Sequence, residues 1–178
     1  MTRFFSKPLR FAILSAMNTE RYQQDKQYMQ QALEDARAAG ERGEIPIGAV
    51  IISPDGILLG RGGNRVEESF SQVRHAEICA LEAAGRAIGD WRLAGSTLYV
   101  TLEPCMMCVS ALALSRVERI VYGAASPVFG YTLDKEGVLQ VYTKHIKNIT
   151  SGVCADEAAQ LLREFFRRER KSGEKHGS

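Results

Sequence analysis

Apolar residues recur along the chain with two periods, one typical of helices and one typical of strands. Apolar positions three and four residues apart predict a helix that starts near Thr19 and ends at Gly40. Two apolar runs with high β-propensity follow at 47–52 and 57–59. The segment 53–56 between them carries a proline and a glycine that favour a tight turn, so we expect an antiparallel hairpin.

The rest of the chain alternates strand and helix. The polar stretch 61–74 predicts a loop that delivers side chains to a site. After it we predict, in order, a helix at 76–87 ended by Gly89, a central strand at 97–101, a helix at 105–114, strands at 119–123 and 148–153, and a closing helix at 156–170. This alternation predicts an α/β fold in three layers, α/β/α, with helices on both faces of the sheet.

Length and composition fit one ordinary domain. The 178 residues are 45% hydrophobic and 25% charged, and no apolar run reaches the roughly 20 residues that cross a membrane. We expect a single domain over 19–170 and a polar tail at 171–178. Residues 1–18 resemble a weak targeting segment without a cleavage site, so we expect a disordered leader or a start at Met17. The formal net charge of +2 excludes a strongly basic coat protein, so any polyanion contact must be local.

Four cysteines are present, and their placement favours free thiols in a reducing compartment. Cys105 and Cys108 have the spacing of metal ligands. Cys79 and Cys154 lie in apolar stretches, where a thiol packs as a small hydrophobic group. We therefore predict a cytoplasmic protein.

A candidate zinc site combines His75 with Cys105 and Cys108. Each group lies where a predicted helix begins, so the positive ends of two helices should converge on the metal and favour thiolates. Three ligands leave tetrahedral zinc with an open position, which distinguishes a catalytic site from a structural one. A structural site would need a fourth ligand, and neither Cys79 nor Cys154 has ligand spacing.

Glu77 supplies a carboxylate that zinc binding does not need. Zinc lowers the pKa of water towards about 7, and Glu77 would take the proton and deliver it to the substrate. Attack on an amidine-like ring carbon with loss of ammonia uses all four groups. Glu77 lies two residues after His75, so the two share a pocket only if His75 occupies an irregular first position of the helix. Two alternatives stay open: a structural or redox Cys-x-x-Cys pair, and a noncatalytic, zinc-stabilised partner subunit.

A set of short motifs follows the chain in a fixed order. They are GEIPIGAV at 43–50, GNR at 63–65, HAEI at 75–78, LYVTLEPC at 98–105 and FFR at 165–167. In this order they resemble the bacterial tRNA-specific adenosine deaminases, a branch of the cytidine deaminase-like zinc enzymes. The resemblance covers about 22–170. It implies a cytidine deaminase-like fold with a mixed sheet of about five strands, Zn²⁺ as cofactor, and a homodimer.

The same resemblance implies a reaction and a set of residue roles. The reaction is the conversion of adenosine to inosine at the wobble position of the anticodon stem-loop of tRNA. His75, Cys105 and Cys108 match the zinc ligands, Glu77 matches the proton shuttle, and Asn64 matches an asparagine that reads the flipped base. Without the resemblance, Asn64 could equally serve the conformation of its loop.

One segment departs from the resemblance. Related enzymes usually carry an acidic residue and a lysine in the loop that meets the anticodon, whereas 124–130 has no charge here. Phe129 or Tyr131 could stack on an unpaired base instead, or be buried. The absence of charge leaves open an alternative function, a zinc-dependent deaminase of a free nucleobase or nucleoside such as guanine, cytosine or cytidine.

The closing helix carries a cluster of basic residues that could follow tRNA phosphates. It consists of Arg167, Arg168, Arg170 and Lys171. Because Glu164 and Glu169 are interleaved with them, an ordinary solvated helix face fits equally well.

Overall fold

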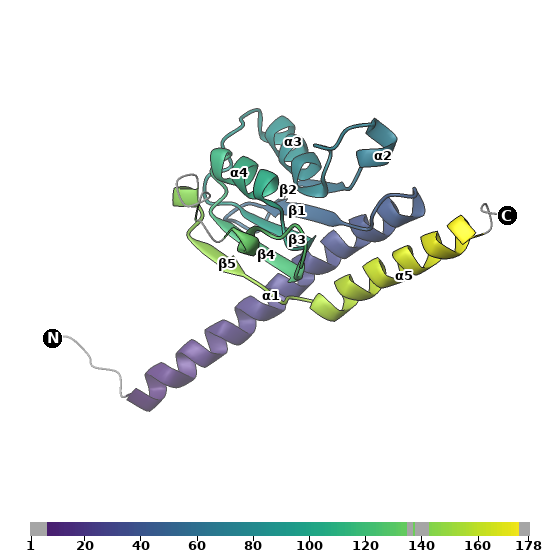
Figure 1. Cartoon of the computed structure of the whole chain (residues 1–178). Helices are drawn as coiled ribbons and strands as arrows, with labels where there is room; N and C mark the ends of the chain where they lie inside the picture. Colours follow the sequence, from purple (N-terminus) through teal and green to yellow (C-terminus); the bar gives the residue numbers. More distant parts are fainter. Residues whose placement is uncertain (1–6, 135–136, 138–142, 175–178) are drawn as a thin grey trace.

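The fold is a five-stranded mixed sheet between two layers of helices, described by a computed structural model over residues 7–134, 137 and 143–174 (Figure 1). The elements are α1 (Lys7–Glu41), β1 (Gly48–Ile52), β2 (Leu58–Gly63), α2 (Val66–Ser69), α3 (Ala76–Ile88), β3 (Thr97–Leu102), α4 (Met106–Leu114), β4 (Arg119–Ala124), β5 (Asn148–Thr150) and α5 (Ala155–Glu174), with short 3-10 turns at Tyr131–Leu133 and Thr143–His145. No helix in these described ranges is long and apolar enough to cross a membrane.

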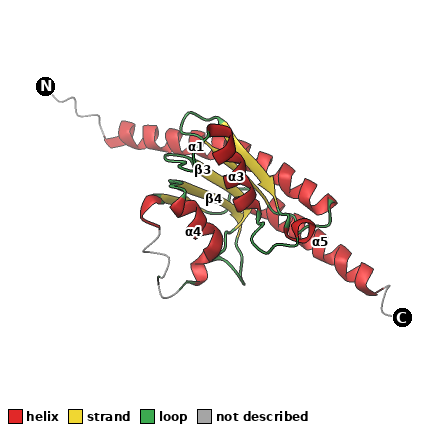
Figure 2. Cartoon of the chain, turned by 90° about the horizontal axis from the view of Figure 1, so that it is seen from above, coloured by secondary structure: helices red, strands yellow, loops and turns green. Residues whose placement is uncertain are grey.

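The layers confirm the predicted α/β/α architecture. The strand order is β2-β1-β3-β4-β5, with β1 antiparallel to both its neighbours and β3, β4 and β5 parallel. Helices α3 and α4 cover one face of the sheet and α1 and α5 cover the other, as Figures 1 and 2 both show. The parallel β3–α4–β4 unit needs a helical crossover, which is why α4 begins directly after β3.

Strand β1 explains why the sheet lies at the centre. All five of its residues are buried, although its side chains alternate between the two faces. Ala49 and Ile51 belong to the core beneath α3 and α4, whereas Val50 and Ile52 belong to the core beneath α1 and α5. A strand that is apolar on both faces is stable only between two helical layers.

The predicted hairpin is confirmed, but the predicted loop at 61–74 is partly wrong. Strand β2 continues to Gly63, which pairs with Gly48, and the short helix α2 follows. The glycines of β2 permit close packing rather than a turn: a Cβ added at Gly62 would lie 2.5 Å from the Cβ of Cys79 on α3. We placed Gly62 and Gly63 in the loop at 61–74 because the helix that packs on them is distant in sequence.

The first helix begins at Lys7, not near Thr19 as we predicted. The structure therefore places a helix over 7–18, where we expected a disordered leader; residues 1–6 lie outside the described ranges. The sequence between Pro8 and Gly40 contains no proline or glycine, so nothing in it interrupts a helix, and Pro8 itself is tolerated in the first turn. In Figure 1 this first part of α1 extends beyond the sheet. At the other end of the chain, α5 continues past the predicted boundary of 170 to Glu174.

A buried ion pair fastens α1 to the sheet. Asp25 accepts two hydrogen bonds from the Arg119 guanidinium, at 2.7 and 2.6 Å, and one at 2.9 Å from the Tyr99 hydroxyl. All three residues are buried. Such a pair fixes the position of α1 on β3 and β4, because breaking it would leave an uncompensated buried charge.

The contact between α3 and β2 can be tested with alanine. A Cβ at Gly60 would lie 2.3 Å from the backbone nitrogen of Ala84, so Gly60→Ala must displace α3. We expect it to lower the free energy of unfolding by about 1–3 kcal/mol, as overpacking does. Gly85 is the matched control, since a Cβ there meets its nearest atom only at 3.4 Å. Gly85→Ala should leave stability unchanged or raise it by up to about 1 kcal/mol, since alanine favours helix. Denaturant unfolding of both variants measures this; equal stabilities would contradict the close contact.

Candidate metal centre and active site

Two helices begin at the candidate metal centre. His75 is the N-cap of α3 and Cys105 is the N-cap of α4, and both have extended backbone angles, with φ −68° and ψ 156°, and φ −76° and ψ 170°, respectively. Cys108 follows one helical turn into α4 and is buried. The partial positive charge at both helix ends favours anionic thiolates at this point.

The three donor atoms lie at the separations that zinc requires. The Nδ1 atom of His75 lies 3.7 Å from the Sγ atom of Cys105 and 3.4 Å from that of Cys108. All three atoms lie within 4.8 Å of one another. Tetrahedral zinc, with bonds of about 2.0–2.1 Å to nitrogen and about 2.3 Å to sulfur, places such ligand atoms about 3.5–3.8 Å apart. His75, Cys105 and Cys108 therefore fit one zinc ion.

The two sulfurs differ in their ionisation. A hydrogen bond from Cys108, together with one from His75, lowers the pKa of the Cys105 thiol to about 4. The Cys108 thiol, which shares its proton with Cys105 and is buried, has a pKa above its ordinary value. The hydrogen bond to Cys105 also raises the pKa of His75. Before a metal binds, the pair therefore carries one thiolate, and metal binding displaces the remaining proton.

Glu77 lies beside these ligands and is 4% exposed. His75 meets the condition that the sequence set for sharing a pocket with Glu77, because it is an extended N-cap and lies outside the regular helix. Burial raises the pKa of the Glu77 carboxyl, and the nearby His75 partly opposes this shift. A raised pKa makes a carboxylate a stronger base, which suits a group that takes up a proton from water.

Asn64 follows β2 and is buried. Its backbone N–H donates to the carbonyl of Ile47 at 2.9 Å, and its side-chain amide donates at 3.2 Å to Glu44, a residue that the sequence did not single out. Glu44 is also buried, and it contacts Val66 and Glu68 of α2. This geometry fixes the side chain of Asn64, while its predicted role in reading a base stays a prediction.

A second missed residue, Glu103, holds the uncharged loop after β4. Its carboxylate accepts hydrogen bonds from the N–H groups of Ser126 and Thr132, at 2.9 and 3.1 Å. A Cβ at Gly130 would lie 2.4 Å from this carboxyl carbon, so only glycine fits there. Gly130 also forms a β-bridge with Cys105, which ties the loop to the metal ligands. The only sequence signal was the position of Glu103, two residues before the first cysteine.

The loop displays one aromatic side chain and buries part of another. Phe129 is 75% exposed, whereas Tyr131 is half-buried and packs edge-to-face on Tyr122 at 6.3 Å between ring centroids. Of the two, Phe129 is therefore the side chain available to a ligand. His145 is exposed, and His176 lies outside the described residues.

The remaining cysteines do not complete a fourth ligand. Within the described ranges, the cluster that could hold a metal contains His75, Cys105 and Cys108 alone. Cys79 faces the carbonyl of Arg74 at 3.9 Å, and Cys154 contacts Gln30 at 3.7 Å. The protein donor set thus leaves the open position of a catalytic zinc.

The sequence matches the model of a known protein family. Residues 22–124 match the cytidine and deoxycytidylate deaminase zinc-binding region. The chain belongs to this deaminase family. The deaminase is therefore a zinc-dependent enzyme, and its fold is the cytidine deaminase-like fold that the motifs implied.

Individual relatives confirm the more specific resemblance. The tRNA-specific adenosine deaminase of Bacillus subtilis strain 168 is 43% identical over 149 residues, which cover 83% of this deaminase and 92% of the relative. A solved structure from a study of A-to-I editing by tRNA:A34 deaminases has a TM-score of 0.71 and 41% identity, covering 76% of this chain and 99% of that one. A guanine deaminase from Nitrosomonas europaea has a TM-score of 0.68 and 29% identity, covering 79% and 83%.

The chemistry of the site follows from these groups. When bound, zinc polarises water and lowers its pKa, which supplies a nucleophile near neutral pH. The Glu77 carboxyl is a titrating group beside these donors and is buried, so its chemistry suits the transfer of a proton away from bulk water.

The role of Glu77 can be separated from metal binding. Glu77→Gln keeps the shape of the side chain but removes the titrating group, so we expect turnover to fall by at least about 10²- to 10⁴-fold. Zinc content, measured by elemental analysis, should stay at the wild-type value because Glu77 is not a ligand. Glu34→Gln on the exposed face of α1 is the matched control and should leave both unchanged. Full activity of Glu77→Gln would remove Glu77 from the mechanism.

Proposed function

We propose that this protein catalyses the hydrolytic deamination of adenosine to inosine at the wobble position of tRNA anticodons. The observation that carries the proposal is the three-donor metal centre with the buried Glu77 carboxyl beside it. The 43% identity to a tRNA-specific adenosine deaminase over most of both chains supports the choice of substrate.

Each predicted site residue has a place in this proposal. His75, Cys105 and Cys108 hold zinc, Glu77 transfers the proton, and Asn64 orients the base of the flipped nucleotide. One N–H of the Asn64 side-chain amide donates to Glu44, so its carbonyl oxygen and its second N–H are left for a base edge.

Basic residues on α5 support a polyanionic substrate. Arg167, Arg170 and Lys171 are exposed, and Arg168 donates to the carbonyl of Gly40 at 3.3 Å. In Figure 1 this part of α5 lies at the same end of the molecule as α2 and the end of α1. A phosphate backbone that leaves the active site on this side would meet these side chains.

We also propose that the protein acts in the cytoplasm as a homodimer. Apolar side chains at both ends of α4, Met106 and Leu114, are exposed, as the residues of a subunit interface would be in one isolated chain. Leu114→Asp should therefore shift the protein towards a monomer in sedimentation experiments. An unchanged dimer would place the interface elsewhere, and a wild-type monomer would contradict it.

The substrate can be tested directly. Purified zinc-loaded protein should form inosine in an anticodon stem-loop that contains the target adenosine and none in the same stem-loop with guanosine at that position. Guanine, cytosine and cytidine should release no ammonia under the same conditions. Ammonia from one of these small molecules, with no inosine in the stem-loop, would favour the alternative of a free-base or nucleoside deaminase.

A further inference from the structure

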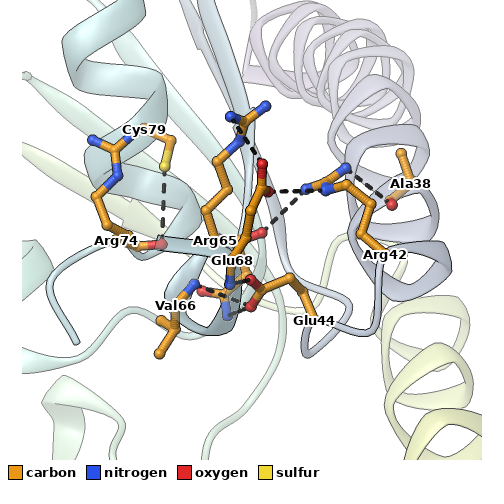
Figure 3. Close-up of polar contacts among 9 residues, drawn as sticks. Ala38, Arg42, Glu44, Arg65, Val66, Glu68, Arg74 and Cys79 are labelled. Carbon is orange, nitrogen blue, oxygen red and sulfur yellow. Dashed lines mark hydrogen bonds and ion pairs between the residues drawn. The ribbon is translucent and has the colours of Figure 1, made fainter. Parts of the chain in front are cut away.

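The turn between Asn64 and His75 is braced by a buried carboxylate. Glu44 is 1% exposed and accepts a hydrogen bond from the side chain of Asn64 at 3.2 Å. It also accepts hydrogen bonds from the N–H groups of Val66 and Glu68, at 3.0 and 2.8 Å (Figure 3). These donors satisfy a group that is costly to bury. Glu44 therefore fixes Asn64 and the helix α2 relative to each other.

Further contacts close this turn at its base. The backbone N–H of Arg65 donates to the carbonyl of Arg74 at 3.0 Å, directly before His75. Arg42, at the end of α1, donates to the carbonyl of Asn64 at 3.2 Å and pairs with Glu68 at 3.4 Å. Both ends of the turn are thus held at the active site.

This rigid turn displays Phe70. The side chain is 97% exposed, and the residue has left-handed backbone angles, φ 49° and ψ 41°. Its N–H donates to Glu67 at 3.2 Å, and the next N–H donates to Val66 at 3.0 Å, which holds this conformation. The left-handed conformation is unfavourable for a bulky residue, and glycine or asparagine would form the same turn more easily. Exposed aromatic surface in a strained position is typical of a binding residue.

The charges around Phe70 favour a base rather than a phosphate as its ligand. Arg65 lies 3.7 Å from Glu68, which also pairs with Arg42, and Arg74 lies 2.6 Å from Glu82. These ion pairs weaken the attraction of the three arginines for phosphate. Aromatic rings, in contrast, stack on any unpaired nucleobase without a need for charge.

We propose that Phe70 is a stacking surface for an unpaired RNA base next to the one that is deaminated, and that Glu44 is the positioning residue that holds it there. The inference rests on the proposed function, because it requires an RNA substrate. It adds a contact directly after α2, in a different segment from the loop after β4 that carries Phe129.

Steady-state kinetics on the anticodon stem-loop test this contact. Phe70→Ala should raise KM by about 5- to 150-fold, the loss that one base stack gives, with little change in kcat. Phe70→Trp should keep the wild-type KM. Tyr22→Ala removes another exposed aromatic, on α1 across the sheet from α3 and α4, and should change neither constant.

A fluorescent base gives a second readout that does not depend on turnover. A stem-loop with 2-aminopurine beside the target adenosine should lose fluorescence on binding to Glu77→Gln protein, because stacking quenches this base. Adding Phe70→Ala should remove most of the quenching at saturating protein, while adding Tyr22→Ala should not.

Glu44→Gln tests the brace. The amide places an N–H group against backbone donors, so KM should rise as in Phe70→Ala, and the double variant should be less impaired than the product of the two single effects. Thermal melting and zinc content confirm that each variant is folded. Multiplicative effects would show that Glu44 does not act through Phe70.

The outcomes separate this inference from the proposed function. A wild-type KM and full quenching in Phe70→Ala would overturn the inference alone. Loss of the dimer in Phe70→Ala would assign the side chain to a subunit contact and also overturn it. Wild-type protein that forms no inosine would overturn the proposed function, and this inference with it.

Discussion

The structure depends on the convergence of two helix starts. Three soft donors meet within 4.8 Å because His75 caps α3 and Cys105 caps α4. The positions of the two helices come from the sheet: the glycines of β2 let α3 approach closely, and the crossover after β3 sets α4. A change in either contact would separate the donors, so the geometry of the metal site depends on how α3 and α4 pack on the sheet.

Three buried glutamates, Glu44, Glu77 and Glu103, lie at this end of the sheet and have different surroundings. Glu44 is saturated by amide donors and braces the turn after Asn64, and Glu103 braces the loop at 124–132 in the same way. Glu77 instead lies among the metal ligands, where burial raises its pKa. The first two thus hold backbone segments next to the metal ligands, while the proposed function gives the third a proton to transfer.

Local spacing made the metal site predictable, and long-range contacts hid its supports. The ligand set and Glu77 are encoded within single helical turns, so sequence analysis found them. Glu44 meets Asn64 across 20 positions and Glu103 meets Thr132 across 29, and no local pattern signals such contacts. The glycines of β2 were misinterpreted for the same reason, since α3 packs on them from a later part of the chain. The start of α1 at Lys7 was missed because charge and apolar composition were weighed above helix propensity.

X-ray absorption spectroscopy of the purified protein tests the central claim most directly. The account predicts one zinc ion per chain with two sulfur ligands at about 2.3 Å, one imidazole nitrogen at about 2.0–2.1 Å, and one light ligand that is not histidine. A well-folded protein without zinc, or a spectrum with a third sulfur or a second imidazole, would contradict a catalytic centre at this position.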